Sequence, residues 1–219
     1  LFDMYGVLID SESLYAKADR RMFETLGITM TQEDAHGLAG VKSREGAKGI
    51  LDRHPDLSIS LDELDALYRQ NLYQTLERAT ELTLIPGVEE WMKRLSNAGV
   101  RMAIASSSTA EMVGLIVERF GLRRYAQFVI NGDEVPHSKP NPEIFLRAAA
   151  GVGAIPARCA VVEDSTFGIL AAKRAGMFCL AYTGANVHGL DNSGADVRVA
   201  VYDEAGLRYL LDEEEAECL

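Results

Sequence analysis

The second part of this 219-residue chain alternates short apolar runs with helical patterns, and this alternation is what most restricts its fold. Four runs are predicted strands: "VRMAIAS", "FVIN", "CAVVED" and "FCLAY". The predicted helices between and before them are Val88 to Asn97, Glu111 to Phe120, Pro142 to Val152 and Phe167 to Ala175. Such alternation implies right-handed crossovers and a parallel sheet covered by helices on both faces.

Residues 11–83 have a different pattern, which is helical throughout. Apolar side chains recur at helical spacing from Leu14 until Gly27, a residue that suits a helix end. A second helix is predicted from Ser43 to Arg53, and a third after Ser60, where "SLDE" has the form of a capping box. This part therefore predicts a small helical bundle without strands.

Asp3 ends the apolar run "LFD" and is assigned to the same parallel sheet. The predicted organisation is a core made of residues 1–10 and 84–219, with residues 11–83 inserted directly after the first strand. Only two residues precede Asp3, whereas a strand typically has about five residues. We therefore expect the first strand to begin before Leu1.

The net charge of -11 argues against non-specific binding to nucleic acid or to an anionic membrane surface, both of which need clustered cations. No apolar run approaches the roughly 20 residues of a membrane span, and no signal-peptide pattern is present. The three cysteines lack zinc-ligand spacing, and their odd number disfavours a disulfide framework. We expect a cytoplasmic monomer with reduced thiols.

Polar residues follow the predicted strands at the edge of the sheet where ligands bind. Asp3 and Ser106 end two strands, Glu163 and Asp164 end a third, and Lys139 lies in a nearby loop. Phosphoryl transfer needs such a set: a carboxylate nucleophile, oxygen ligands for Mg²⁺, and a cation with hydroxyl donors for the phosphate oxygens. Adjacent acids without a base also favour a divalent counter-ion.

Each of these residues also has a simpler interpretation. An Asp before a glycine turn is usually a turn or cap residue, Ser106 suits the cap of a helix beginning near Thr109, and Lys139 suits an exposed loop. His137 is interpreted as an exposed loop residue rather than as a base. The functional interpretation depends on all the strand ends meeting in one cleft.

Four segments, "FDMYGVLIDSE", "IASSS", "SKPNPEIF" and "VVEDSTFGILAAKRAGM", resemble in order and spacing the four motifs of the haloacid dehalogenase superfamily. The resemblance is to the branch with a helical cap after motif one, which includes β-phosphoglucomutase and many small phosphatases. It implies an α/β fold with a Rossmann-like parallel-sheet core and an inserted all-helical cap.

The resemblance also implies roles for the catalytic residues. Asp3 matches the nucleophile that forms an aspartyl-phosphate, Ser106 the motif-two hydroxyl, and Lys139 the motif-three lysine. Ser107, beside the motif-two hydroxyl, is assigned to substrate binding. The expected substrate is a small phosphorylated metabolite such as a sugar phosphate.

The implied cofactor is Mg²⁺. Its expected ligands are the side chains of Asp3, Glu163 and Asp164 and the backbone carbonyl of Tyr5, which occupies the position two residues after the nucleophile.

Tyr5 is the departure from the family pattern. Phosphatases and mutases of this branch have Asp there as the general acid and base, and a phenol with a pKa near ~10 is a poor base at neutral pH. L-2-haloacid dehalogenases have "FDxYG", which "FDMYG" matches, but they lack the acidic pair of motif four and have Tyr where this chain has Phe145. We interpret the chain as a phosphatase with impaired proton transfer. A metal-independent dehalogenase and a catalytically silent phosphometabolite-binding protein remain alternatives.

The cap is expected to supply specificity. "GVKSREGA" resembles a β-phosphoglucomutase cap segment, so Arg44 or Lys42 is a candidate contact for a distal phosphate. A solvated helix start is the equally weighted alternative. Phosphatase and mutase activity are not distinguished at this point.

Overall fold

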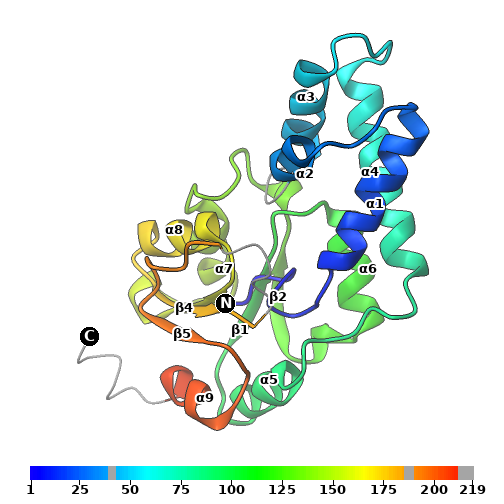
Figure 1. Ribbon diagram of the computed structural model, residues 1–219. Helices are drawn as coiled ribbons and strands as arrows, with labels where there is room; N and C mark the ends of the chain where they lie inside the picture. Colours follow the sequence, from blue (N-terminus) through cyan, green and yellow to red (C-terminus); the bar gives the residue numbers. More distant parts are fainter. Residues whose placement is uncertain (39–42, 185–189, 212–219) are drawn as a thin grey trace. The chain divides into compact units, whose positions relative to one another are not determined.

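The computed structural model describes residues 1–38, 43–184 and 190–211 (Figure 1). The chain divides into two compact units. Leu1–Asp10 and Thr83–Leu219 form one, called the core unit, and Ser11–Leu82 forms the other, called the cap unit. Lys42, one of the two predicted distal-phosphate contacts, lies outside the described residues.

The core unit contains a parallel sheet. Its strands are β1 (Met102–Ala105), β2 (Ala126–Ile130), β3 (Ala160–Glu163), β4 (Phe178–Tyr182) and β5 (Val197–Val199). β1 pairs with β2, and β4 pairs with both β3 and β5, always in parallel. The first residues of the chain join the two groups, because the Phe2 amide donates to the Ala103 carbonyl at 2.9 Å and the Asp3 amide to the Val162 carbonyl at 3.0 Å. The order is therefore β2, β1, residues 1–3, β3, β4, β5, which confirms the predicted parallel sheet.

Five α-helices of the core unit surround this sheet. They are α5 (Val88–Asn97), α6 (Ala110–Arg119), α7 (Glu143–Gly151), α8 (Thr166–Arg174) and α9 (Glu204–Leu211). Short 3₁₀ turns are η1 (Leu122–Arg124), η2 (Gly132–Glu134) and η3 (Pro156–Arg158). The sequence pattern predicted the first four helices to within one or two residues at each end. It did not predict β5 or α9.

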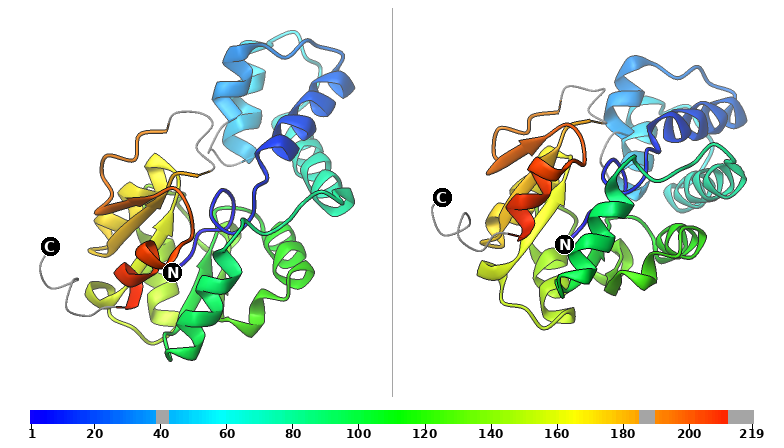
Figure 2. Two further views of the ribbon diagram at one scale, coloured as in Figure 1. Left: turned by 60° about the horizontal axis from the view of Figure 1, so that its bottom comes forward. Right: turned by 90° about the horizontal axis from the view of Figure 1, so that it is seen from below.

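Alternation along the strands explains why both faces are covered. Side chains on one face of the sheet form a core cluster with α7 and α8, in which Phe145 is the largest fully buried side chain. Successive residues of a strand point to opposite faces, so the buried Ile104, Val162 and Leu180 point away from that cluster. α5 and α9 pack together on the other side of the sheet (Figure 2).

The cap unit is helical throughout its described residues. Its helices are α1 (Glu12–Leu26), α2 (Gln32–Leu38), α3 (Ser43–Arg53) and α4 (Leu61–Arg78). Gly27 ends α1 in the left-handed conformation, at φ 69°. Ser60 and Glu63 form the predicted capping box at the start of α4. No helix in the described ranges of the whole chain is long and apolar enough to cross a membrane.

Asp34 links three elements inside the cap unit. Its carboxylate is fully buried and accepts hydrogen bonds from the Thr31 amide at 3.0 Å, the Thr31 hydroxyl at 2.8 Å and Arg53 Nε at 2.7 Å, while His54 Nε2 lies 3.1 Å away. Burial alone would raise the pKa of Asp34, but these donors outweigh it and hold the pKa well below its usual range. The ionised carboxylate therefore stabilises the fold.

We predict that Asp34→Asn lowers the free energy of unfolding by about 3 kcal/mol at pH 7, because it leaves the half-buried Arg53 without its counter-charge. The difference should shrink as the pH falls below about 4, where the carboxylate of the unfolded chain becomes protonated. Thermal unfolding across a pH series measures this. Asp52→Asn, which removes only an exposed pair with Lys48, is the control and should change stability by less than about 0.5 kcal/mol. Equal effects of the two variants would contradict the prediction.

The pKa of Asp19, in the same unit, is shifted in the opposite direction to that of Asp34. It is buried in α1, and burial raises its pKa to about 6, although a hydrogen bond with Tyr68 and the charge of Arg20 partly oppose this. Between pH about 4 and 6 the folded protein holds a proton that the unfolded chain has lost, so stability falls as the pH rises through this window. The ionised Asp19 therefore destabilises the fold at neutral pH.

We predict that Asp19→Asn raises the free energy of unfolding at pH 8 by roughly 2 kcal/mol and changes it little at pH 4. Chemical denaturation at the two pH values measures the difference. A variant less stable than the parent protein at pH 8 would show that the Asp19 charge is stabilised by its surroundings.

Candidate active site

Lys139 joins two of the predicted site residues. Its Nζ donates to Asp3 Oδ1 at 2.5 Å and to Glu163 Oε1 at 2.6 Å. The three side chains are buried, with exposed fractions of 7%, 11% and 1% for Lys139, Asp3 and Glu163. Nζ also lies 3.4 Å from the carbonyl of Ala105, the residue before Ser106. The structure thus brings the strand-end residues Asp3, Ala105 and Glu163 together around Lys139, as the sequence predicted.

The topology of the sheet explains this convergence. Asp3 follows the chain segment between β1 and β3, Ser106 follows β1, and Glu163 ends β3, so all three lie at the carboxyl edge of neighbouring parallel strands. Lys139 comes from the loop before α7, and its ammonium lies 4.8 Å from the ring centroid of the buried Phe145. Lys139 is therefore an internal residue, and the interpretation as an exposed loop lysine is wrong.

The charges in this site are not balanced by its own residues. Burial, together with Glu163, raises the pKa of Asp3 to about 6, although Lys139 opposes the shift. Burial would lower the pKa of Lys139, but the two carboxylates raise it above its ordinary value, so the amine stays protonated. One ammonium thus faces three carboxylates when Asp164 is included.

Glu163 is fully engaged within the core unit. Its Oε1 binds Lys139, and its Oε2 accepts hydrogen bonds from the amides of Asp164 and Ser165, both at 2.8 Å, and from the Ser165 hydroxyl at 2.9 Å. Gly168 makes room for it, since a Cβ there would lie 1.7 Å from Glu163 Oε1. These contacts favour a role in orienting Lys139 and the turn after β3. Its predicted role as a metal ligand stays a prediction and requires one of these partners to be exchanged.

Asp164 packs against the turn that follows Asp3. A Cβ on Gly6 would lie 2.0 Å from Asp164 Oδ2, and Gly6 has φ 77°, a conformation that other residues rarely adopt. Burial, then Glu163 and Asp3, raises the pKa of Asp164 well above its usual value. Gly6 directly follows Tyr5, so the carboxylate of Asp164 lies beside the backbone of the turn that carries Tyr5.

The carboxylates of this site suit a bound Mg²⁺, although they are not arranged around a common metal position. The surplus of buried carboxylate and the close approach of Asp164 to the Tyr5–Gly6 peptide suit a divalent cation held by Asp3, Asp164 and the Tyr5 carbonyl. No group of three His, Cys, Asp or Glu side chains in the described parts of the chain is already arranged as a metal site.

The loop after β1 carries Ser106 and Ser107. The buried Ser106 donates its amide to the Ile130 carbonyl at 3.1 Å, and its hydroxyl accepts from the Ser108 amide at 3.3 Å. The loop packs on Gly132, where a Cβ would lie 2.1 Å from the Ser107 carbonyl. Thr109 caps α6 in its place, so the interpretation of Ser106 as a helix cap is wrong. The substrate-contact role of Ser107 stays a prediction.

Tyr5 lies in the turn between Asp3 and Gly6. The turn is closed by backbone hydrogen bonds, among them Gly6 amide to Ile9 carbonyl at 2.9 Å and Leu8 amide to Met4 carbonyl at 2.8 Å. The side chain of Tyr5 is partly buried. Its position two residues after Asp3 agrees with the motif, and its effect on proton transfer stays a prediction.

Arg44 belongs to the cap unit, at the start of α3. Its guanidinium lies 2.7 Å from Asp62 and 4.0 Å from Asp65, both on α4. About half of the Arg44 side chain is exposed, and its ion pair with Asp62 agrees with the alternative that Arg44 is a solvated residue at the start of a helix. Binding of a distal phosphate by Arg44 stays a prediction. His137 is exposed, as expected.

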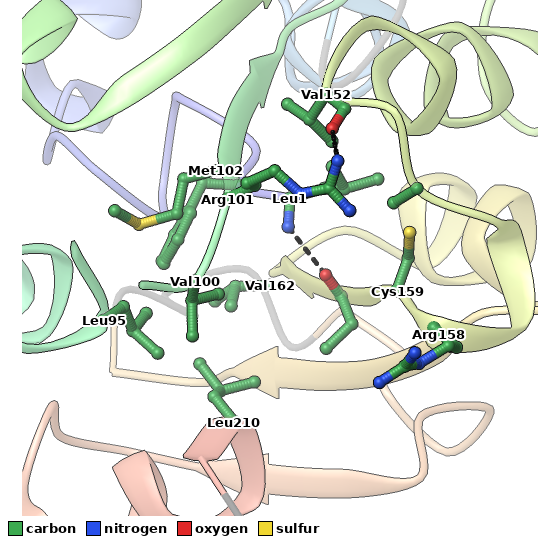
Figure 3. A pocket seen from close by; sticks show the side chains of 13 residues that line it. Leu1, Leu95, Val100, Arg101, Met102, Val152, Arg158, Cys159, Val162 and Leu210 are labelled. Carbon is green, nitrogen blue, oxygen red and sulfur yellow. Dashed lines mark hydrogen bonds between the residues drawn. The ribbon is translucent and has the colours of Figure 1, made fainter. Parts of the chain in front are cut away.

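A cavity of about 180 Å³ lies at the other end of the strands (Figure 3). It is lined by residues at the amino ends of β1 and β3, among them Leu1, Met102 and Cys159. The Leu1 ammonium donates to the Ala160 carbonyl there at 2.7 Å. This cavity is separate from the cluster around Lys139 and has no part in the candidate active site.

The sequence indicated a glycine turn after Asp3, but it did not predict the close contacts that Gly6, Gly132 and Gly168 allow. Gly6, Gly132 and Gly168 each admit a neighbouring group that a Cβ would displace. A glycine three residues after a strand-end Asp was a possible signal for Gly6. The other two depend on contacts between distant segments, which leave no local pattern.

The geometry defines a class of protein: an α/β protein with an aspartate at a strand end, a lysine beside it and a helical insert after the first strand. Residues 1–182 match the family described as "Haloacid dehalogenase-like hydrolase". The chain belongs to this family.

Relatives and solved structures agree with this assignment. The chain is 32% identical over 181 residues to the phosphorylated carbohydrates phosphatase of Thermotoga maritima, covering 81% of each chain. It is 28% identical to the β-phosphoglucomutase of Bacillus subtilis, over 97% of this chain and 93% of that one. The crystal structure of CbbY from Rhodobacter sphaeroides in complex with phosphate superposes with a TM-score of 0.81 at 26% identity, covering 94% of this chain and 96% of that one.

The contact between Gly6 and Asp164 leads to a sharp prediction. Gly6→Ala should reduce phosphomonoester hydrolysis by at least about 100-fold, because the new Cβ displaces the Asp164 carboxylate and with it the alignment of the site. Steady-state kinetics with an aryl phosphate and Mg²⁺ measure the loss.

Gly27→Ala is the matched control for this change. Gly27 has a similar φ of 69°, but a Cβ there meets nothing within 4 Å. It should therefore cost about 1 kcal/mol of stability from backbone strain and leave the rate unchanged. Similar activity losses in both variants would show that strain, rather than the contact with Asp164, matters.

Proposed function

We propose that the protein is a Mg²⁺-dependent phosphatase of small phosphorylated sugars that works through an aspartyl-phosphate at Asp3. The observation that carries the proposal is Lys139 Nζ, within 2.6 Å of both Asp3 and Glu163, at the carboxyl edge of the sheet and beside the Ser106 loop. The names of the relatives support the choice of substrate class, since one of them is a phosphatase of phosphorylated carbohydrates.

In the first step a carboxylate oxygen of Asp3 attacks the phosphorus atom. An acyl-phosphate bond forms between the Asp3 oxygen and phosphorus, and the bond from phosphorus to the sugar oxygen breaks. The electron pair of that bond leaves with the sugar oxygen, which takes up a proton from the Tyr5 phenol. Lys139 offsets the negative charge of the phosphoryl group, and the Ser106 hydroxyl donates to one of its oxygens. The amino end of α6, which follows this loop, adds partial positive charge.

In the second step a water molecule attacks the phosphorus of the aspartyl-phosphate. The acyl-phosphate bond between the Asp3 oxygen and phosphorus breaks, the Asp3 carboxylate is restored, and inorganic phosphate leaves with the oxygen of the water. Asp3, Asp164 and the Tyr5 carbonyl would hold Mg²⁺, which would supply charge neutralisation for the phosphoryl group. Glu163 keeps the ammonium of Lys139 directed at the nucleophile throughout.

Tyr5 determines which of the two steps is slow. A phenol with a pKa near ~10 carries a proton at neutral pH and can donate it to the leaving sugar oxygen. The phenolate so formed regains a proton from solvent, and the neutral phenol then present in the second step cannot accept a proton from the attacking water. Breakdown of the aspartyl-phosphate should therefore limit turnover. The phosphoenzyme then accumulates during catalysis.

A metal-independent 2-haloacid dehalogenase is the second candidate, and Tyr5 is the observation that favours it. Displacement of halide from carbon by Asp3 requires no proton for the leaving group. The buried carboxyl groups of Glu163 and Asp164 disfavour it, because an anionic carboxylate substrate would meet additional negative charge.

The test is turnover of a panel of sugar phosphates by the protein and by its Tyr5→Asp variant. We predict a gain of about 10²- to 10⁴-fold in turnover for the variant, because a carboxylate restores general-base catalysis. Activity should require Mg²⁺ and disappear in chelator, and Asp3→Asn should be inactive in both backgrounds.

Other outcomes distinguish the alternatives. Halide release from a 2-haloacid in the presence of chelator would establish the dehalogenase. Thermal stabilisation by a sugar phosphate, with no turnover even in the Tyr5→Asp variant, would indicate a binding protein. A Tyr5→Asp variant slower than the parent protein would contradict the role assigned to Tyr5.

A further inference from the structure

Tyr202 contacts the turn that follows the nucleophile, although 195 positions separate it from that turn. Its hydroxyl donates to the Val7 carbonyl at 2.8 Å in a buried hydrogen bond. Val7, Leu8 and Ile9 are fully buried, so the backbone of this turn depends on protein partners for its hydrogen bonds. Tyr202 is the partner that comes from the far end of the chain.

Tyr202 is itself held firmly. Its ring stacks on Tyr182 at 4.4 Å with an interplanar angle of 1°, and the ring of Trp91 meets it edge-on at 4.7 Å. Trp91 Nε1 donates to the carbonyl of Asp203 at 2.9 Å. Three rings and the adjacent backbone thus fix the direction of one hydroxyl.

The backbone of Tyr202 packs closely against Gly87, which has no side chain to block it. Gly87 has φ 89°, and a Cβ on it would lie 2.6 Å from the Tyr202 carbonyl oxygen. Two residues earlier, the Ile85 amide donates to the Leu8 carbonyl at 2.9 Å. The start of α5, the segment before α9 and the turn after Asp3 therefore meet at one point.

The same turn presents Gly6 to the Asp164 carboxylate, as described above. Gly6 precedes Val7 directly, so a shift of the Val7 carbonyl moves the peptide that faces Asp164. We propose that Tyr202 is a positioning residue, whose hydroxyl holds the Val7 carbonyl and so fixes Tyr5 and Gly6 against Asp164 for catalysis at Asp3.

The hydroxyl of Tyr202 is suited to this role at any working pH. Burial, followed by Tyr182 and the carboxylates of Asp164 and Asp3, raises its pKa well above the usual value. It therefore remains a donor.

The test compares Tyr202→Phe with Tyr182→Phe in the full chain. Both variants keep the stacked ring pair and lose one hydroxyl, but only the first removes a bond to the turn. The first readout is hydrogen exchange of the Gly6, Leu8 and Ile9 amides without substrate or metal. Exchange should become about tenfold faster in Tyr202→Phe, the equivalent of one lost hydrogen bond, and stay unchanged in Tyr182→Phe.

The second readout is catalysis, and this arm rests on the proposed function. Tyr202→Phe should lower kcat for an aryl phosphate about tenfold, leave KM within about twofold, and raise the Mg²⁺ concentration needed for half-maximal rate. A parent protein without phosphatase activity would overturn the proposed function, while the exchange measurement would still decide the role of Tyr202.

Gly87→Ala gives an independent test that keeps the hydroxyl. Its Cβ pushes the Tyr202 backbone away, so it should reproduce the effects of Tyr202→Phe, whereas Gly27→Ala should not. The positioning role is overturned if exchange in the turn is unchanged in Tyr202→Phe. It is also overturned if the amides of Ala105 and Val162 in the sheet lose protection equally, because this would show general loosening.

Discussion

The ammonium of Lys139, shared between the buried carboxylates of Asp3 and Glu163, is the interaction on which the rest of the active site depends. A buried charge is tolerated only when it is paired and hydrogen-bonded, so each of these residues requires the other two. Because they come from three separate segments, the ion cluster is satisfied only when the parallel sheet is assembled with its strand ends aligned. The fold and the site therefore require one another.

Around this cluster, the site is shaped as much by missing side chains as by charged ones. Gly6 admits Asp164, Gly132 admits the loop of Ser106, and Gly168 admits Glu163 beneath the start of α8. Each close approach brings a polar group near the backbone of a glycine. Van der Waals contacts with that backbone, as well as hydrogen bonds, then fix the position of the polar group. Such contacts give the small tolerance that a nucleophile in line with phosphorus needs.

Much of this was readable from the sequence because the relevant signals are local. Helix ends at Gly27 and Ser60, and strand ends at Asp3 and Glu163, follow from periodicity and from residue preferences within a few positions. The short β5 and α9 were missed because an isolated run of three residues or one short helix has no distinct period. Tyr202 was missed for a different reason: its role depends on a contact across 195 positions, which only the folded chain contains.

The departure at Tyr5 is compatible with this organisation because binding and proton transfer depend on different groups. Lys139, Glu163 and Asp164 set the charge of the site through their contacts with Asp3, with the turn after β3 and with Gly6. The backbone of the turn is held by its own hydrogen bonds and by Tyr202, so its path does not require Asp at this position. Under the proposed mechanism, a change of side chain there would alter the rate of proton transfer while Lys139, Glu163 and Asp164 keep their geometry.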